Sequence, residues 1–390
     1  MRGRYFVRNK ALNTLFRAID AFLWMFAWAF PHNRQRPVQR LLIANGAHLG
    51  DVVLATAVLP ALKEALPGVR IGMLVGSWSA PLVRDHPLLD WVHVVDHWSS
   101  NRGKQSLFEK FAIYLRTRRH ALREIRKIDY DCAVDLYFYF PNSIALLRQC
   151  GIPQRIGYTS AGFGPLLTQR LDLRLSNRSI VEYHLDLLRL IPEGQGLRAA
   201  AARPILPRTP LDTSALTGGT GYIVLHMGSG SPLKDWPVDA WHSLVGTLSE
   251  AGHRLVFTGS GARERDQVMS VIGSATQGVD LCDRLKWREF VEVVAGADLL
   301  VGVDSVAGHI AAAVGTPVIV IGNGMNNPFL WRPASAESTV MMQQVPCAPC
   351  YRKTGCTTMT CIRSLSAAAV ATQVFEVLAR RASEASVLPA

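Results

Sequence analysis

The sequence predicts an α/β protein with two doubly wound, Rossmann-like domains that face a cleft. Short apolar segments alternate with helical stretches in two successive series, and a Pro- and Gly-rich stretch separates the series. The 390 residues are enough for two or three domains of roughly 150 residues each. A hydrophobic content of 49% excludes an intrinsically disordered chain, and the longest apolar runs are too short for a polytopic membrane protein.

The first series leads into a linker. Its expected strands are 41–44, 70–76, 91–96 and 132–137, and its expected helices are 51–66, 106–127 and 142–150. Prolines at positions 192, 204, 207 and 210, followed by GGTGY at 218–222, indicate a connection between domains. We therefore divide the chain into residues 1–40, 41–210 and 211–390.

The second series repeats the alternation. Its expected strands are 222–228, 254–260, 279–282, 298–303 and 317–323, and its expected helices are 238–251, 262–273, 287–296 and 305–314. A last helix, over about 364–381, is expected to pack back across the first domain. Such an architecture is common among transferases but does not by itself identify a reaction.

The net charge of +12 is concentrated in two segments. Residues 1–40 carry +7 and residues 101–130 carry +6, so the rest of the chain is close to neutral. A nucleic-acid enzyme is expected to line a long groove with Lys and Arg, and this distribution argues against one. The second basic segment, 106–127, has helical spacing of its apolar residues and is either a solvated helix face or a contact with anionic lipid.

The first basic segment encloses ten consecutive apolar residues, Ala21 to Phe30, which are rich in Phe and Trp. An amphipathic, aromatic helix lying in the headgroup layer of a membrane fits this composition and the flanking arginines. A secretory signal has a similar form, although Asp20 precedes the apolar core and Trp28 occupies a position that usually holds a small residue. The third interpretation is a helix that packs on the protein itself or on a partner subunit.

Asp51 lies in the loop after the first strand, where Gly46 and Gly50 flank a turn. Open α/β sheets bind ligands at the carboxyl ends of their strands. Asp51 is therefore either a helix cap or a general base that takes a proton from an incoming hydroxyl.

Two further motifs follow strands of the second domain. Small residues at 228–231 leave backbone N–H groups available to an anion, and Lys234 adds a positive charge suited to phosphate. Asp304 follows the strand 298–303 and precedes a helix that begins with small residues, where a diphosphate can approach the backbone. Asp304 and His309 also have structural interpretations, as a helix cap and as a hydrogen-bonded histidine near the core.

In their order, these motifs resemble glycosyltransferase family 9, the bacterial heptosyltransferase family of lipopolysaccharide core assembly. The similarity extends over about 41–380 and is carried by AHLGDVV, YDCAVDLYFYFPNSIALL, HMGSGSPLKDWP, FTGSGARERDQ and DLLVGVDSVAGHIAAAVGTP. Ala47 replaces the usual Ser, Met227 replaces the usual Pro, and NGMNNPFLWRP departs from the stretch that commonly holds the nucleotide base.

The resemblance implies a GT-B type, inverting and metal-independent transferase without a cofactor, using a nucleotide-diphospho-sugar, usually ADP-heptose. By this resemblance Asp51 is the base, and the residues that bind the donor are Ser229, Ser231, Lys234, Glu264, Asp304, Ser305, Val306, Ala307, Gly308 and His309. The acceptor is a lipopolysaccharide-core, lipid-linked or surface glycan. The expected location is the cytoplasmic face of the bacterial inner membrane, with the protein peripheral on its anionic surface and not bound to nucleic acid.

Alternatives remain for the donor and for the class of protein. The alternative donors are a UDP-sugar and a GDP-sugar. The alternative to an enzyme is a non-catalytic subunit that binds nucleotide-sugars in a glycan assembly complex. Four cysteines lie within CAPCYRKTGCTTMTC, at 347–361. The cluster has three interpretations: reduced thiols in a structured loop, a metal site, or a disulfide bond. An odd total of seven cysteines in 390 residues excludes a disulfide scaffold.

Overall fold

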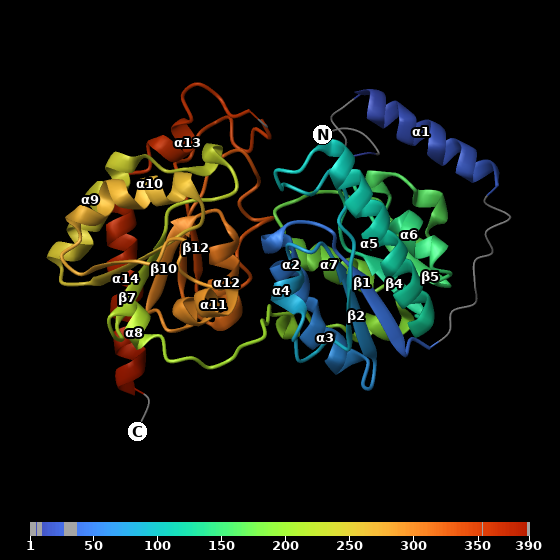
Figure 1. The fold of residues 1–390 in the computed structure, drawn as a ribbon, viewed down its shortest axis with the longest axis horizontal. Helices are drawn as coiled ribbons and strands as arrows, with labels where there is room; N and C mark the ends of the chain where they lie inside the picture. The colour runs from blue at the N-terminus through green and yellow to red at the C-terminus, as the bar shows by residue number, and fades with distance from the viewer. Residues whose placement is uncertain (1–4, 6–9, 27–36, 353, 388–390) are drawn as a thin grey trace. The chain divides into compact units, whose positions relative to one another are not determined.

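The computed structural model describes residues 5, 10–26, 37–352 and 354–387. The chain forms two compact units, Met1–Pro207 and Arg208–Ala390, which are drawn in Figure 1. The boundary between the units falls within the Pro-rich stretch that the sequence marks as a linker. Each unit is described by itself below.

The first unit is built on a six-stranded parallel sheet with the strand order β3-β2-β1-β4-β5-β6. Its strands are β1 (Arg40–Ala44), β2 (Arg70–Val75), β3 (Trp91–Val94), β4 (Cys132–Asp135), β5 (Gln154–Tyr158) and β6 (Gln169–Leu171). Its helices are α1 (Lys10–Met25), α2 (Leu49–Thr56), α3 (Val58–Ala65), α4 (Ala80–Val83), α5 (Leu107–Ile128), α6 (Ile144–Gln149) and α7 (Ile180–Leu188). Short 3-10 helices are η2 (Thr159–Ala161), η3 (Gly164–Leu166), η4 (Pro192–Gly196) and η5 (Ala199–Ala201).

The second unit repeats this topology in a parallel sheet with the order β12-β11-β10-β7-β8-β9. Its strands are β7 (Tyr222–His226), β8 (Arg254–Thr258), β9 (Gly278–Asp280), β10 (Leu299–Val303), β11 (Val318–Ile321) and β12 (Ser338–Met341). Its α-helices are α8 (Ser214–Thr217), α9 (Val238–Glu250), α10 (Ala262–Val271), α11 (Trp287–Ala295), α12 (Val306–Val314), α13 (Thr360–Arg363) and α14 (Ala367–Val387). Two 3-10 helices are η6 (Pro232–Lys234) and η7 (Ile272–Ser274). The two doubly wound α/β domains are thus confirmed.

The strand order places a switch point at the centre of each sheet. The chain moves outward from β1 through β2 to β3 and then returns to the other side of β1 with β4. In the second unit β7 and β10 are neighbours in the same way. Loops that leave the carboxyl ends of these neighbouring strands diverge, and the space between them is where doubly wound sheets bind ligands.

Several elements differ from the sequence prediction. The predicted helix 51–66 is two helices that meet at Ala57, because Pro60 has no N–H to donate to the carbonyl of Thr56. The strand β5 was not predicted, because it carries the buried Arg155, whose guanidinium donates to the carbonyl oxygens of Ile152 and Leu166. Neither β6 nor β12 was predicted, because both are short edge strands without buried residues.

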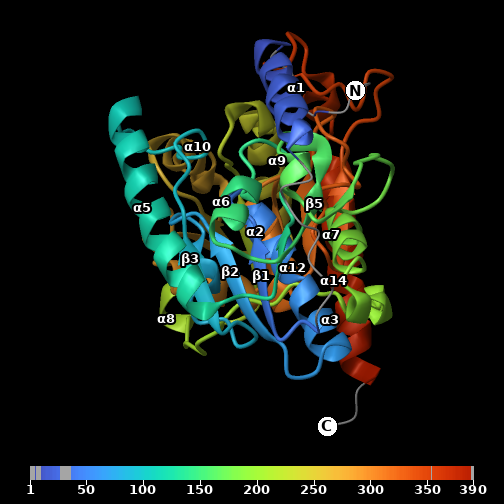
Figure 2. The same ribbon diagram turned by 90° about the vertical axis from the view of Figure 1, so that its right-hand side faces the viewer.

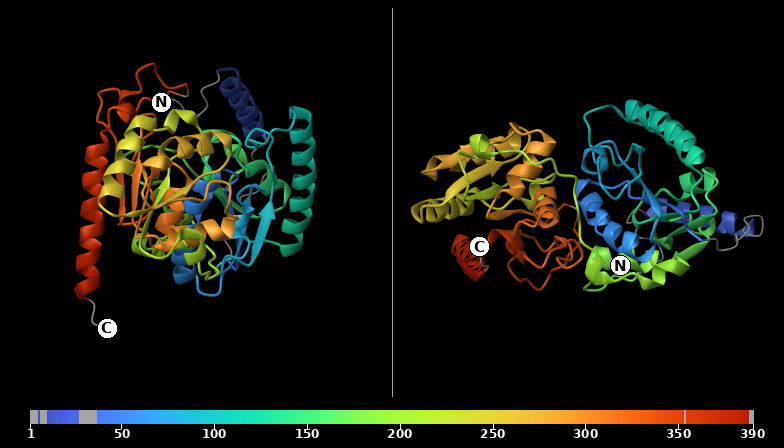
Figure 3. Two further views of the ribbon diagram at one scale, coloured as in Figure 1. Left: turned by 60° about the vertical axis from the view of Figure 1, so that its left-hand side comes forward. Right: turned by 90° about the horizontal axis from the view of Figure 1, so that it is seen from below.

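The prediction that the last helix packs across the first domain is wrong. Val370, Val374 and Val377 of α14 belong to the core of the second unit, together with Trp236 and Trp241. The left view of Figure 3 shows α14 lying along the side of this unit. The cause is the apolar spacing of α14, which fits the apolar face of α9.

The helix α1 packs on the first unit through one face. Phe16 is 3% exposed. Its ring centroid lies 5.0 Å from that of Phe140 and 6.0 Å from that of Phe163. The buried carboxylate of Asp20 accepts hydrogen bonds from the Tyr5 hydroxyl at 2.7 Å and from the Phe163 N–H at 2.8 Å. Packing on the protein itself is therefore correct for this face.

The opposite face of α1 exposes large apolar side chains, namely Leu15, Phe22 and Met25, and the exposed Phe26 follows the helix. Trp24 is partly exposed but contacts the first unit, because the Arg170 guanidinium lies 4.5 Å from its ring centroid. The rest of the apolar run, from position 27 to 30, lies outside the described residues. Among the described residues, no helix combines the length and apolar character needed to cross a bilayer.

Phe16→Ala is expected to loosen α1 from the first unit, because a buried aromatic side chain replaced by alanine typically costs about 3 kcal/mol or more. Trypsin cleavage at the exposed Arg17, followed by mass spectrometry, measures the loosening. Phe22→Ala on the exposed face of the same helix is the matched control and should cleave as slowly as the wild type. Equal cleavage rates for both variants would show that α1 does not depend on Phe16.

Candidate active site

Lys234 and Asp304 meet at the switch point of the second unit. Lys234 ends the short helix η6 after β7, and Asp304 directly follows β10. The Lys234 Nζ lies 2.6 Å from the Asp304 Oδ2 and donates to the Asp304 carbonyl oxygen at 3.2 Å. Both side chains are only partly exposed. The pair places one positive and one negative charge at the edge of the sheet, because each residue follows the carboxyl end of a strand.

Trp236 anchors the loop that carries Lys234. Its ring is buried, its Nε1 donates to the Leu365 carbonyl at 3.1 Å, and it packs edge-on against Trp241 at 5.1 Å. Because a buried tryptophan with a satisfied N–H has little freedom, the residue two positions earlier is held at the carboxyl end of β7. The spacing Lys-Asp-Trp-Pro in the sequence therefore has a structural reason.

Ser229 and Ser231 close a tight turn between β7 and η6. The Ser229 hydroxyl donates to the Ser231 carbonyl at 2.9 Å and accepts from the Ser231 N–H at 3.2 Å. At Gly228, before this turn, a Cβ would lie 2.2 Å from the Glu264 Cγ, so no larger residue fits there. The two serines thus shape the loop at the site.

The start of α12 has polar atoms without a protein partner. Ser305 is the N-cap residue but its hydroxyl caps no backbone N–H, and among the described residues neither the buried Ser305 Oγ nor the buried His309 Nδ1 has a hydrogen-bond partner. Burial lowers the pKa of His309 to about 4, so its ring is neutral at pH 7. Unused N–H groups at a helix start attract anions, and a ligand there would satisfy these atoms.

Glu264 lies against the same loop from α10. Its carboxylate accepts from the Ser260 N–H at 2.8 Å, and burial raises its pKa above the ordinary range. Arg263, beside it, binds the Asp235 carboxylate and the Ser229 carbonyl oxygen and lies 3.7 Å from Glu264. The sequence analysis missed Arg263, since its hydrogen-bond partners, Asp235 and Ser229, come from a distant segment.

Asp51 lies in the first unit, at the third position of α2 rather than at its N-cap. Its Oδ2 accepts from the His48 N–H at 3.2 Å, and the carbonyl of Asp51 accepts from the Asn45 side chain at 3.3 Å. The Trp78 Nε1 donates to the Ala47 carbonyl at 2.8 Å. These bonds hold the loop from Asn45 to His48 and, with it, the Asp51 carboxylate at the carboxyl end of β1.

Asp135 and Tyr137 are a second group that the sequence analysis did not single out. Asp135 ends β4 beside Ala44 of β1, and its buried carboxylate accepts from the N–H groups of Ser143 at 2.5 Å and Tyr137 at 3.1 Å. Burial raises the pKa of Asp135 to about 7. Burial and, secondarily, the charge of Asp51 raise the pKa of Tyr137.

The four clustered cysteines form no disulfide bond with one another in the structure. Cys347, Cys350, Cys356 and Cys361 line one pocket of about 300 Å³, but within the described part of the chain no group of three His, Cys, Asp or Glu side chains is placed to hold a metal ion. Hydrogen bonds from Thr358 and from the Met359 N–H lower the pKa of the Cys356 thiol.

The structure thus gathers the predicted donor residues around the switch point of the second unit. Ser229, Ser231 and Lys234 follow β7, Glu264 lies on α10, and residues 304–309 follow β10. Asp51 lies at the corresponding edge of the first unit.

Comparison with known proteins supports the resemblance to glycosyltransferase family 9. The family model for glycosyltransferase family 9 (heptosyltransferase) matches residues 118–360. Lipopolysaccharide heptosyltransferase 3 of Escherichia coli K12 is 27% identical over 297 residues, which cover 73% of this chain and 82% of that protein. Lipopolysaccharide heptosyltransferase 1 of Pseudomonas aeruginosa PAO1 is 25% identical over 324 residues, which cover 81% and 87%.

Solved structures share the fold. A glycosyl transferase family 9 structure from Veillonella parvula matches with a TM-score of 0.73 at 19% identity and covers 88% of this chain and 98% of its own. The E. coli heptosyltransferase WaaC with ADP matches with a TM-score of 0.63 at 19% identity and covers 87% and 99%. The family match spans well over half of this chain, and the polar motifs lie at the carboxyl ends of β1, β7 and β10. The chain therefore belongs to glycosyltransferase family 9 and is a glycosyltransferase with the GT-B fold.

Proposed function

We propose that this enzyme transfers a heptose-like sugar from an ADP-linked donor to a hydroxyl of a lipopolysaccharide-core or other lipid-linked glycan, with inversion and without a metal ion. The observation that carries the proposal is the Lys234–Asp304 pair beside the unpartnered polar atoms at the start of α12. In this proposal residues 41–210 bind the acceptor and residues 211–390 bind the donor.

Asp51 is the base in this reaction. A single carboxylate removes the proton of the acceptor hydroxyl, the hydroxyl oxygen attacks the anomeric carbon, and the bond from that carbon to the diphosphate breaks. One displacement of this kind inverts the anomeric configuration. The bond from the His48 N–H fixes the direction of the Asp51 carboxylate, which supports its use as a positioned base.

The leaving diphosphate is held by groups of the second unit. The N–H groups of Val306, Ala307 and Gly308 at the start of α12 and the Ser305 hydroxyl supply hydrogen-bond donors. The Lys234 ammonium supplies the positive charge that a divalent ion provides in other transferases. Asp304 holds hydroxyls of the donor sugar, because a carboxylate is better suited to hydroxyls than to phosphate.

The donor assignment rests on the family and on Glu264. One relative in the fold comparison, the E. coli heptosyltransferase WaaC, is described in two structures, with ADP and with an ADP-sugar, which favours an ADP-linked donor here. Glu264 is an acceptor next to the Ser229 loop and would contact the nucleoside or sugar.

The proposed location is the cytoplasmic face of the inner membrane, where lipid-linked acceptors are presented. The exposed apolar face of α1 supports a peripheral attachment, since Phe and Met side chains flanked by basic residues favour the interface of a bilayer. Phe16 and Asp20 face the protein at the same time, so the helix would join the first unit to the membrane surface.

Asp51→Asn is expected to lower kcat by on the order of a hundredfold or more, because the amide accepts the His48 N–H but cannot take a proton. Release of ADP from ADP-heptose, measured with a lipopolysaccharide-core acceptor, gives the rate. Binding of ADP, measured by calorimetry, should stay within about twofold of the wild type, since Asp51 lies outside the donor-binding unit.

The matched control for this change is Asp129→Asn, at the exposed C-terminal end of α5. It should keep the wild-type rate. Unchanged transfer by the Asp51 variant would rule out its role as the base, and absence of transfer by the wild type would rule out this donor and acceptor.

Lys234→Met is expected to weaken ADP binding by roughly tenfold to a hundredfold, because a charged hydrogen bond to phosphate is lost and Asp304 is left without its counter-ion. Ligand-induced increases in Tm for ADP, UDP and GDP measure the binding and rank the nucleotides. Lys286→Met, at an exposed lysine of the same unit, is the control. A larger increase with UDP or GDP than with ADP would contradict the ADP assignment.

Replacing two exposed apolar residues of α1, in the variant F22S/M25S, is expected to shift the protein from the membrane to the soluble fraction of cells. The buried Phe16 and Asp20 are left in place, so the first unit keeps its packing. Western blotting of the two fractions measures the shift. The same distribution as the wild type would show that this face of α1 is not an anchor.

A further inference from the structure

The N-terminal turns of α5 present apolar side chains to solvent. Leu107 is 75% exposed, Phe108 is 83% exposed, and Phe111 is 47% exposed. Among α5 residues, only Ala121 and Ile125, near the other end of the helix, are fully buried. Figure 2 shows α5 beside β3 at the edge of the first unit's sheet, so the helix has one packed side and one long outer side.

The C-terminal turns of α5 carry positive charge. Arg119 and Arg123 lie on the same side of the helix as Phe108, because they follow it by 11 and 15 residues, which are close to whole numbers of turns, whereas Leu107 lies on the side of the buried Ile125. The helix contains seven basic and two acidic residues, and Arg116, Arg119 and Arg123 are exposed. Within the described part of the chain these three arginines form no ion pair. The acid nearest to them in sequence, Glu124, is engaged by His120 at 3.2 Å and His93 at 3.5 Å.

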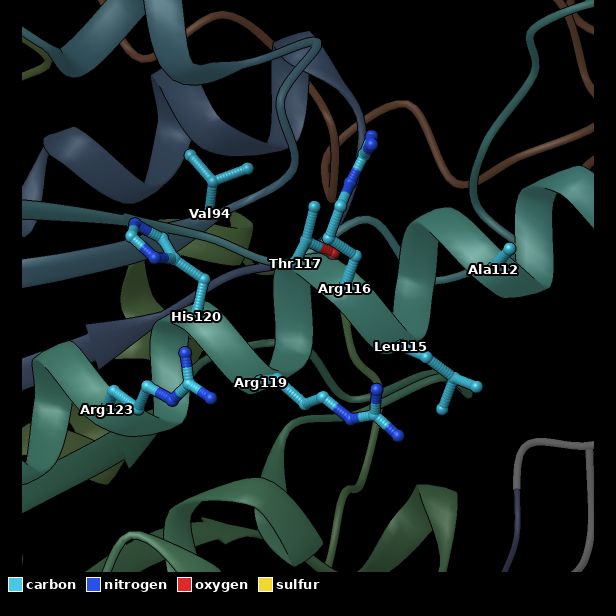
Figure 4. A pocket seen from close by; sticks show the side chains of 8 residues that line it. All are labelled: Val94, Ala112, Leu115, Arg116, Thr117, Arg119, His120 and Arg123. Carbon is cyan, nitrogen blue, oxygen red and sulfur yellow. The ribbon is translucent and has the colours of Figure 1, made fainter.

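A pocket of about 670 Å³ lies beside the middle turns of α5. Val94, Ala112 and Leu115 give it apolar walls, and Arg116, Arg119, His120 and Arg123 line it as well. In Figure 4 the Arg116 and Arg119 side chains extend in opposite directions from the helix. The guanidinium groups are thus spread over the surface rather than gathered around a single point.

We propose that the outer side of α5 binds the surface of a membrane that contains anionic phospholipids. This goes beyond the function proposed above, which assigns membrane contact to α1 alone. Leu107 and Phe108 would enter the boundary between headgroups and acyl chains, and Arg119 and Arg123 would contact lipid phosphates.

The arrangement favours a lipid surface over other anionic partners. A compact phosphate ligand needs convergent cations, whereas Arg116 extends away from Arg119. A nucleic acid offers no place for exposed Leu107 and Phe108, whose burial in a bilayer interface is favourable. Exposed apolar side chains together with exposed arginines on one helix suit the interface of an anionic bilayer.

Co-sedimentation of the full-length protein with vesicles tests the proposal. Vesicles of phosphatidylglycerol and phosphatidylcholine in equal parts are compared with vesicles of phosphatidylcholine alone. The variant R119E/R123E is expected to bind the anionic vesicles at least about tenfold more weakly than the wild type, and added salt should weaken the wild type more than the variant. The variant L107S/F108S should also lose about tenfold, with little change in its salt dependence.

The matched control variants make the same kinds of substitution at exposed positions outside α5. R84E/R203E reverses two exposed arginines of the first unit that lie outside α5, and M269S/F329S removes two exposed apolar side chains of the second unit. Both should bind vesicles like the wild type. Equal binding by R119E/R123E and the wild type, or an equal loss in R84E/R203E, would overturn the proposal.

Vesicle binding does not depend on catalysis, so this test stands apart from the proposed reaction. The α5 variants retain α1, so a failure of α1 as an anchor is also distinguishable. ADP release with a soluble, delipidated acceptor should be unchanged in R119E/R123E, and a loss there would overturn the assignment of this surface to membrane binding.

Discussion

The parallel direction of the strands is the constraint on which the rest of the structure depends. In each unit every strand runs the same way, so the carboxyl ends lie at one edge and the loops that follow them are neighbours. The reversal of strand order beside β1 and beside β7 then separates two of these loops and leaves room for a ligand. Charges from distant parts of the chain, such as Lys234 and Asp304, meet for this reason.

Buried anchors hold the polar groups at these edges. Trp236 fixes the loop of Lys234, and the Asp135 carboxylate holds two N–H groups of the loop after β4. In contrast, Ser305 and His309 each have a buried polar atom without a partner among the described residues. Unsatisfied buried atoms are costly, and they are retained where a ligand can satisfy them. In the second unit, the loop of Lys234 and the start of α12 therefore combine rigid support with polar groups available to a ligand.

The excess positive charge is concentrated outside the candidate donor site. It lies in the N-terminal segment and along α5, whereas the loops proposed to bind the donor contain the paired charges of Lys234 and Asp304. Both α1 and α5 expose apolar side chains next to basic ones, while each is anchored to the first unit through buried residues, Phe16 in one and Ile125 in the other. Surface attachment and nucleotide binding are thus assigned to different units of the chain.

The sequence by itself determined the two doubly wound domains and the loops that carry Asp51, Lys234 and Asp304, because periodicity and contiguous motifs are local properties. Tertiary structure decided what depends on distant partners. Arg155 could enter the buried strand β5 only because carbonyl oxygens from neighbouring loops satisfy it, and α14 joined the second unit because α9 offers an apolar face. A linear pattern contains no record of such partners, since their contacts form only when the chain is folded.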